Sequence, residues 1–144
     1  KQKSEIFRNA LEDYYNKVRV QEAIQATYFG YLAAVKEREE NYPTGLLVGN
    51  TGFAIPHTDS SKVNYSQICF ASLNKPVEFA NMGDKNDIVK VELVFMLAMS
   101  QPHEQVQTLQ NLIALFQDEE AIKKVKECNN EEEFINILNE KEIY

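Results

Sequence analysis

Apolar residues recur at helical spacing in the first part of the chain. They return every three or four positions over residues 6–18, where Ser4 is a suitable N-cap, and again over residues 20–35. The second pattern closes on the charged segment 36–41, and Pro43 makes a continued helix costly. The sequence therefore predicts two helices before Pro43.

The middle of the chain changes to short apolar segments separated by turn residues. Strands are predicted at both ends of the stretch GLLVGNTGFAIPH, with a turn at residues 50–52. Residues 67–73 and 77–79 flank a second predicted turn at 74–76. The long run 89–99 is rich in Val, Leu and Phe, which is typical of a strand that is buried on both faces.

Helical spacing returns after Pro102. Three further helices are predicted from apolar spacing, over residues 106–116, 121–125 and 134–138. Asp118 would cap the second of these helices, and Asn130 with Glu133 resembles a capping box at the start of the third. Helices at both ends must cover the sheet between them, so the sequence predicts one α/β domain over residues 1–144.

Charge and hydropathy narrow the classes of partner. The chain has 15 basic and 22 acidic residues, a net charge of −7, and no basic block longer than Lys123-Lys124. Nucleic acid and anionic membrane surfaces are therefore not expected as partners. The longest apolar run, Leu93 to Met99, is far shorter than the roughly 20 residues that cross a bilayer, and the first residues do not resemble a signal segment. We expect a cytoplasmic location and no membrane insertion.

Metal binding is not expected from the two cysteines and two histidines. The four residues lack the close ligand pairs of zinc sites; they are His57, Cys69, His103 and Cys128. Neither cysteine belongs to a Cys-x-x-Cys pair, so both are interpreted as reduced structural thiols.

One short segment, residues 52–58 (GFAIPHT), combines a buried strand with a reactive side chain. Pro56 has a fixed φ and no N–H, so it should end strand pairing and hold His57 at a rigid strand end next to solvent. A neutral imidazole offers a nucleophilic nitrogen that can accept and return a phosphoryl group without a cofactor. The alternative is a strand-end histidine that only binds a neighbouring backbone group, and the residues alone leave both interpretations open.

Five ordered segments carry a family resemblance. They are EREENYPTGL at 37–46, GFAIPHT at 52–58, KPVEF at 75–79, MG at 82–83 and LVFMLA at 93–98. Together they resemble the enzyme IIA domain of the fructose/mannitol class of bacterial sugar phosphotransferase systems. The YPTGL segment and the long loop before the histidine are similar to the galactitol branch. The resemblance runs from about Ser4 to Leu138, nearly the whole chain.

The resemblance implies a fold and a reaction. The fold would be a mixed β-sheet flanked by helices on both faces, the mannitol-type enzyme IIA sandwich. His57, which follows Ala-x-Pro, would accept phosphate on Nε2 from the phosphocarrier HPr and pass it to a cysteine of an enzyme IIB. The membrane enzyme IIC would take part only indirectly, and no cofactor is implied. The sugar, the oligomeric state and the extent of the full polypeptide are left open by the sequence.

Two further positions follow from the family pattern. The family's arginine falls on Arg38, where a guanidinium would suit phosphate oxygens; the alternative is a solvated charge at a helix end. Many relatives carry a second histidine at the position that falls on Gln105. His103 is the competing candidate, but a shift of two residues turns a helical side chain by about 200°. Gln105 is therefore preferred as the neighbour of His57, and His103 is interpreted as a surface residue.

Other residues near the motif are weaker candidates. Thr58 could bond the ring or the phosphate, and Thr44 is a lesser candidate for the same site. Asp59 is left out, because a carboxylate beside a phosphate would cost affinity. Phe53, if exposed, would belong to a shallow apolar docking surface for HPr and IIB.

Two other functions remain compatible with these residues. A regulatory relative would use the same histidine to report its phosphorylation state to a transcription factor or a kinase. A binding module would have the fold without phosphotransfer. The first would keep a reactive His57 and the second would need an inert one.

Overall fold

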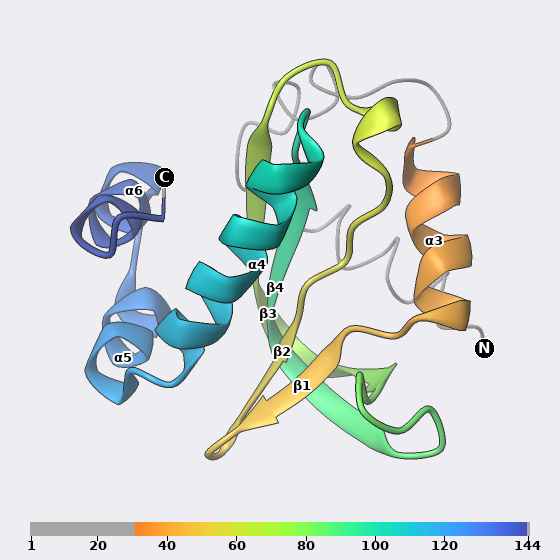
Figure 1. Ribbon diagram of the computed structural model, residues 1–144. Coiled ribbons are helices and arrows are strands. Elements are labelled where there is room, and N and C mark those ends of the chain that lie inside the picture. Colours follow the sequence, from red (N-terminus) through yellow and green to blue (C-terminus); the bar gives the residue numbers. More distant parts are fainter. Residues whose placement is uncertain (1–30, 144) are drawn as a thin grey trace. The chain divides into compact units, whose positions relative to one another are not determined.

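The computed structural model describes residues 31–143. The described elements, in chain order, are α3 (Tyr31–Asn41), β1 (Gly45–Val48), β2 (Thr51–Ala54), η1 (Ser60–Lys62), β3 (Gln67–Ala80), β4 (Ile88–Ala98), α4 (Pro102–Phe116), α5 (Glu119–Glu127) and α6 (Glu131–Glu140) (Figure 1). The predicted helix over 6–18 and residues 20–30 of the next one lie outside the described residues. By their contacts the residues fall into two compact units, divided between Gln105 and Val106, and each is described by itself.

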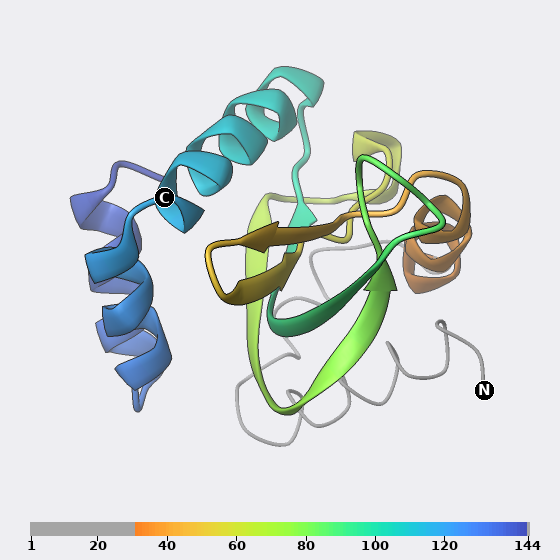
Figure 2. The same cartoon turned by 90° about the horizontal axis from the view of Figure 1, so that it is seen from below.

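The first unit contains a mixed four-stranded sheet in the order β1-β2-β4-β3. Strands β2 and β4 pair in parallel, while β1 with β2 and β3 with β4 pair antiparallel. Helix α3 runs along one side of these strands in both ribbon views (Figures 1 and 2). The expectation of an α/β fold with a mixed sheet is confirmed.

The β1–β2 hairpin is tighter than the sequence pattern predicts. Val48 pairs with Thr51, so only Gly49 and Asn50 form the turn, and the predicted turn at 50–52 is wrong. Gly49 has a φ of 59° and Asn50 does not share its positive φ, which is the pattern of a type II′ turn. Gly52 lies inside β2 instead, where an added Cβ would lie 1.9 Å from the backbone oxygen of Lys90.

The predicted turn at 74–76 is also wrong, because β3 runs without a break from Gln67 to Ala80. The pairing with β4 shifts between Ser72, which opposes Leu93, and Val77, which opposes Val91. The residues between them form a bulge on a long strand. Pro76 is tolerated there because β3 is the outer strand of the sheet.

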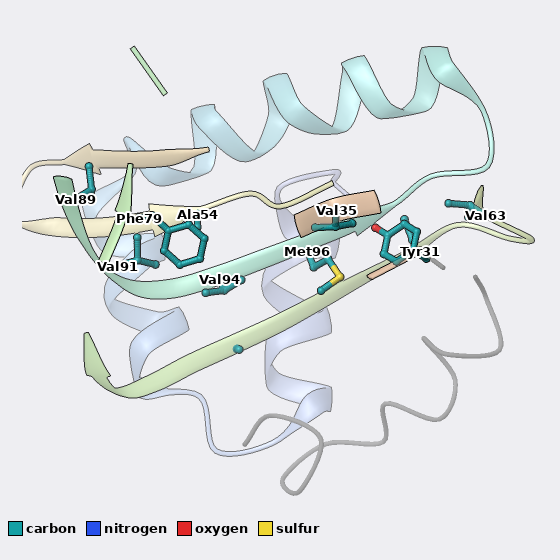
Figure 3. Packing of buried hydrophobic residues seen from close by; sticks show 11 residues of the cluster. Tyr31, Val35, Ala54, Val63, Phe79, Val89, Val91, Val94 and Met96 are labelled. Carbon is teal, nitrogen blue, oxygen red and sulfur yellow. The ribbon is translucent and has the colours of Figure 1, made fainter. Parts of the chain in front are cut away.

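Strand β4 holds the core of the first unit. Its residues from Leu93 to Ala98 are all buried, as predicted for a strand covered on both faces, while Ile88 and Lys90 near its start are exposed. Val94, Met96 and Ala98 belong to one cluster with Tyr31 and Val35 of α3. Figure 3 shows Tyr31 and Val35 near the C-terminal part of this strand, so α3 covers one face of the sheet there.

The second unit contains the rest of α4 with α5 and α6, and both predicted helix caps are confirmed. The Asp118 side chain accepts a hydrogen bond from the Ala121 N–H at the start of α5. The Asn130 side chain accepts one from the Glu133 N–H at the start of α6, and Glu133 accepts in return from the N–H of Asn129. No helix within residues 31–143 is long and apolar enough to cross a membrane.

Candidate active site at His57

His57 lies three residues after the end of β2 and continues its path beside β4. The N–H of Leu97 donates to the backbone oxygen of Pro56 over 3.0 Å, and His57 forms an isolated parallel bridge with Leu97. Pro56 itself has no N–H to donate, so regular pairing of β2 stops while the chain stays attached to β4. The backbone at His57 is therefore held by the central strand.

The imidazole of His57 is fixed by its own chain. Its Nδ1 lies 2.7 Å from the backbone oxygen of Ile55. A carbonyl oxygen only accepts, so Nδ1 carries the proton and Nε2 is left with its lone pair when the ring is neutral. This contact selects the nitrogen that can act as a nucleophile.

The expectation that His57 lies next to solvent is wrong. The residue is 8% exposed, so the ring is almost covered. Burial is the main cause that lowers the pKa of His57 below its ordinary value, because a charged ring is poorly solvated there. The bond to Ile55 acts in the opposite direction, and the positive charge of Arg38 lowers the pKa further. Burial and Arg38 both favour the neutral, nucleophilic ring at neutral pH.

Arg38 lies close enough to His57 to affect its charge state. The residue is half-buried in the last turn of α3, and its Nε is buried without a hydrogen-bond partner among residues 31–143. Its guanidinium carbon lies 5.3 Å from the centre of the Tyr42 ring. A guanidinium with an unused donor differs from the solvated helix-end charge that was the alternative interpretation.

Thr44 stands directly before β1 and contacts the site through the backbone. Its hydroxyl donates to Glu39 Oε1 over 2.7 Å and accepts from the Ile55 N–H over 3.2 Å. Its own N–H donates to Glu39 Oε2 over 2.7 Å. The only proton of this hydroxyl is thus already donated to Glu39, and Thr44 supports the residue whose carbonyl holds His57.

Glu39 is the site residue that the sequence interpretation missed. It belongs to the charged segment 36–41, yet it is 8% exposed and both of its carboxylate oxygens accept from Thr44. The signal was helical spacing, because Tyr31, Val35 and Glu39 stand four residues apart and all three are buried. A glutamate in an acidic segment therefore lies on the buried face of a helix when it stands four residues after the last of a series of buried positions.

The start of α4 separates the two candidates for the second position. Its first turn is anchored by Ser66, whose hydroxyl donates to Glu104 Oε2 over 2.8 Å and accepts from the Ser100 N–H over 3.0 Å. His103 is exposed, whereas Gln105 is half-buried and its Oε1 has no hydrogen-bond partner within the described residues. Among the hydrogen bonds of residues 31–143, none joins the side chain of Gln105 to His57.

The remaining predicted residues lie as follows. Thr58 is buried directly after His57, and Asp59 is exposed at the start of η1. Phe53 is 0% exposed, so the expectation that it forms a docking surface is wrong. Strand β2 is covered on both faces, which leaves no side chain of this strand for a partner.

Comparison with known proteins places these residues in a family context. The model of the family "Phosphoenolpyruvate-dependent sugar phosphotransferase system, EIIA 2" matches residues 1–141. The galactitol-specific EIIA component of Escherichia coli K12 is 29% identical over 90 residues, which are 62% of this chain and 59% of that protein. The ascorbate-specific EIIA component of the same strain is 26% identical over 109 residues, covering 75% of this chain and 68% of that protein.

The fold is also found in a solved structure. The complex of enzyme IIA mannitol and phosphorylated enzyme IIB mannitol from Escherichia coli superimposes with a TM-score of 0.62 at 21% identity, covering 94% of this chain and 86% of the matched one. The mannitol-type enzyme IIA fold that the sequence suggested is thereby confirmed. By the match over residues 1–141, this chain belongs to the EIIA 2 family of the phosphoenolpyruvate-dependent sugar phosphotransferase system.

Proposed function

We propose that this chain is a phosphocarrier that accepts a phosphoryl group on Nε2 of His57 and passes it to a cysteine of an enzyme IIB. The observation that carries the proposal is the 2.7 Å contact between His57 Nδ1 and the Ile55 oxygen, since it leaves Nε2 as the free nucleophile. The lowered pKa of His57, which is due first to burial, favours the neutral ring that this reaction requires. Family membership supplies the class of reaction.

The two transfer steps balance without a cofactor. In the first, the Nε2 lone pair of His57 attacks the phosphorus of phospho-HPr, an N–P bond forms, and the HPr ring nitrogen leaves with the electron pair of the broken N–P bond. In the second, a thiolate of enzyme IIB attacks, an S–P bond forms, and the electron pair returns to Nε2. The proton stays on Nδ1, hydrogen-bonded to the Ile55 oxygen, throughout both steps, so no general base is needed at the ring.

Arg38 is proposed to stabilise the transferring group. Phosphoryl transfer depends on positioning and on cations or donors that meet the charge on the three equatorial oxygens. Arg38 already acts electrostatically on His57, and its buried Nε lacks a partner among the described residues. Gln105 is a second candidate, since its amide could donate to a phosphoryl oxygen. Thr58 is proposed as a neighbour of the phosphate from its place in the chain alone.

The proposed partners follow from the two half-reactions. HPr is the donor and enzyme IIB the acceptor, in keeping with the similarity to a chain in a complex that contains phosphorylated enzyme IIB mannitol. Both partners must reach the same imidazole, so their binding should be mutually exclusive. The membrane enzyme IIC would be only an indirect partner, through IIB, and the reaction would take place in the cytoplasm.

The transported compound is not specified by the site. The galactitol-specific and the ascorbate-specific relatives have similar identities to this chain, 29% and 26%, although they are specific for different compounds. The groups described around His57 would bind the imidazole or the phosphoryl group, so none of them specifies a sugar. The galactitol branch suggested by YPTGL stays a proposal.

The experiment is a phosphorylation assay with a matched histidine control. Incubation with phosphoenolpyruvate, enzyme I and HPr should add an acid-labile phosphate, and nitrogen-15 NMR of the product should place it on Nε2 of His57. His57→Ala should abolish labelling, whereas His103→Ala should label like the wild type because His103 is exposed on α4. Undiminished labelling of His57→Ala, or phosphate on Nδ1, would show that the proposal is wrong.

A further inference from the structure

A buried chain of hydrogen bonds connects the end of α3 with the ring of His57. Both oxygens of Glu39 accept from Thr44, the Thr44 hydroxyl accepts from the Ile55 N–H, and the Ile55 oxygen lies 2.7 Å from His57 Nδ1. Every link except the ring contact joins residues that are separated in sequence but share this buried region. The ring of His57 is thus linked through this chain to the carboxylate of Glu39.

We propose that Glu39 and Thr44 are positioning residues that hold Ile55 so that its carbonyl fixes the Nδ1–H tautomer of His57. Their consequence for phosphoryl transfer rests on the function proposed above. Their effect on the tautomer does not, because it concerns the unphosphorylated protein. Neither residue needs to touch the phosphoryl group, so they act only through Ile55.

The direction of each hydrogen bond follows from the backbone donors. The Ile55 N–H can only donate, so the Thr44 oxygen faces it as an acceptor, and the single hydroxyl proton of Thr44 points to Glu39 Oε1. The second bond, from the Thr44 N–H to Glu39 Oε2, fixes the backbone of Thr44 as well. Glu39 is the anchor because both of its oxygens accept from the same residue, one from the side chain and one from the backbone.

The geometry of Ile55 explains why such an anchor is needed. The Ile55 carbonyl belongs to the peptide bond with Pro56. Because Pro56 has no N–H, this peptide group cannot donate a hydrogen bond to a neighbouring strand. The segment is held on one side by Leu97, whose N–H donates to the Pro56 oxygen over 3.0 Å. Thr44 holds the other side through the Ile55 N–H. With the chain fixed on both sides, the carbonyl between them has a fixed direction.

The base of the β1–β2 hairpin brings the two partners together. Gly45 pairs with Ala54, so the residues just outside this pair, Thr44 and Ile55, must lie side by side. Glu39 reaches the same point because it stands on the buried face of α3, four residues after Val35. The arrangement therefore follows from the fold of the first unit and involves no residue of the second.

The test reads the tautomer directly. Nitrogen-15 NMR of histidine-labelled, unphosphorylated protein distinguishes a protonated from an unprotonated ring nitrogen, and His103 serves as an internal reference. Wild type should show His57 protonated at Nδ1. Thr44→Val, which removes the hydroxyl and keeps the shape, should give a mixture of both tautomers, and Thr44→Ser should restore the wild-type pattern. Transfer from phospho-HPr should slow about 10- to 100-fold in Thr44→Val, by analogy with residues that hydrogen-bond and orient the ligands of metal sites.

Two further variants separate positioning from stability. Val35→Ala opens a cavity on the same face of α3 and should destabilise the fold without changing the tautomer. Glu39→Gln keeps the side-chain size but replaces one acceptor by a donor that faces Thr44, so it should shift the tautomer like Thr44→Val, and it takes the place of that variant if Thr44→Val does not fold. A folded Thr44→Val or Glu39→Gln protein with the wild-type tautomer would overturn the proposal. If wild type accepts no phosphate while the tautomer still responds, the phosphocarrier function fails and the positioning role stands.

Discussion

The guanidinium carbon of Arg38 lies 5.3 Å from the centre of the Tyr42 ring, one helical turn further along the chain. The Tyr42 N–H also donates to the Arg38 oxygen over 2.6 Å, so the same two residues close the end of α3. Tyr42 is 67% exposed, and its ring keeps the cation from extending freely into solvent. The pair explains how an arginine at a helix end stays near a buried histidine.

Arg38→Gln should raise the pKa of His57, because one of the two influences that lower it is removed while burial remains. The same change should slow transfer from phospho-HPr by about 100-fold, as removal of one positioned donor does at other charged transition states. An NMR titration of His57 and single-turnover kinetics measure the two effects. Lys36→Gln, the same loss of charge on α3, is the control. An unchanged pKa in Arg38→Gln would contradict the electrostatic link.

The lowered pKa of His57 should make folding depend on pH. In the unfolded chain the pKa of the His57 ring returns to about its ordinary value of 6.5. Between this pH and the lower pKa of the folded protein, the unfolded state therefore binds more protons. The contribution is fully present above about pH 6.5 and is lost as the pH falls toward the folded pKa. Urea unfolding over a pH series should show this loss in wild type and in His103→Asn. His57→Asn should lack it, and equal profiles for all three proteins would contradict the prediction.

Gln105 and His103 can be separated by kinetics. Gln105→Ala should slow phosphorylation by phospho-HPr by about 100-fold if its amide meets the transferring group, and Gln105→His should keep substantial activity. His103→Ala should be nearly silent, because its side chain is exposed. Single-turnover phosphorylation rates decide between them. A slow His103→Ala beside a normal Gln105→Ala would assign the second role to His103.

The cap of α6 offers a test of the second unit. Asn130→Ala should lower the free energy of unfolding by about 1 kcal/mol, because the Glu133 N–H loses its side-chain acceptor. Asn136→Ala makes the same chemical change at an exposed position inside the helix and should be neutral or slightly stabilising. Chemical denaturation measures both variants. Equal losses would show that the cap contributes nothing.

Patterns in the sequence predict which helices and strands form better than they predict where each one begins and ends. The caps at Asp118 and Asn130 were readable because side chain and helix start are close in sequence. The bulge at 73–76 resembles a turn in the sequence, since Asn74 and Pro76 are typical of turns and the pairing of β3 with β4 is not a local property. The hairpin turn was displaced for a similar reason, because cross-strand register decided it at Gly49.

The candidate site divides in the same way. His57 could be singled out because Pro56 and the flanking apolar residues mark a strand end, and the family resemblance gave it a role. The burial of its ring, the choice of Nδ1 by Ile55 and the pairing of Glu39 with Thr44 depend on segments that meet only in the folded chain. Helical spacing from Val35 was the one available hint for Glu39.

The tip and the base of the β1–β2 hairpin have different roles. The base carries Thr44 and Ile55, while the tip consists of Gly49 and Asn50, and Leu47 near the tip is exposed. Because antiparallel arms stay in register when both grow by the same length, residues added in matched pairs beside the turn leave the base unchanged. A single added residue would instead require a bulge or a slip. The tip is therefore a suitable place to insert a fluorophore or an affinity tag while the histidine site stays assembled.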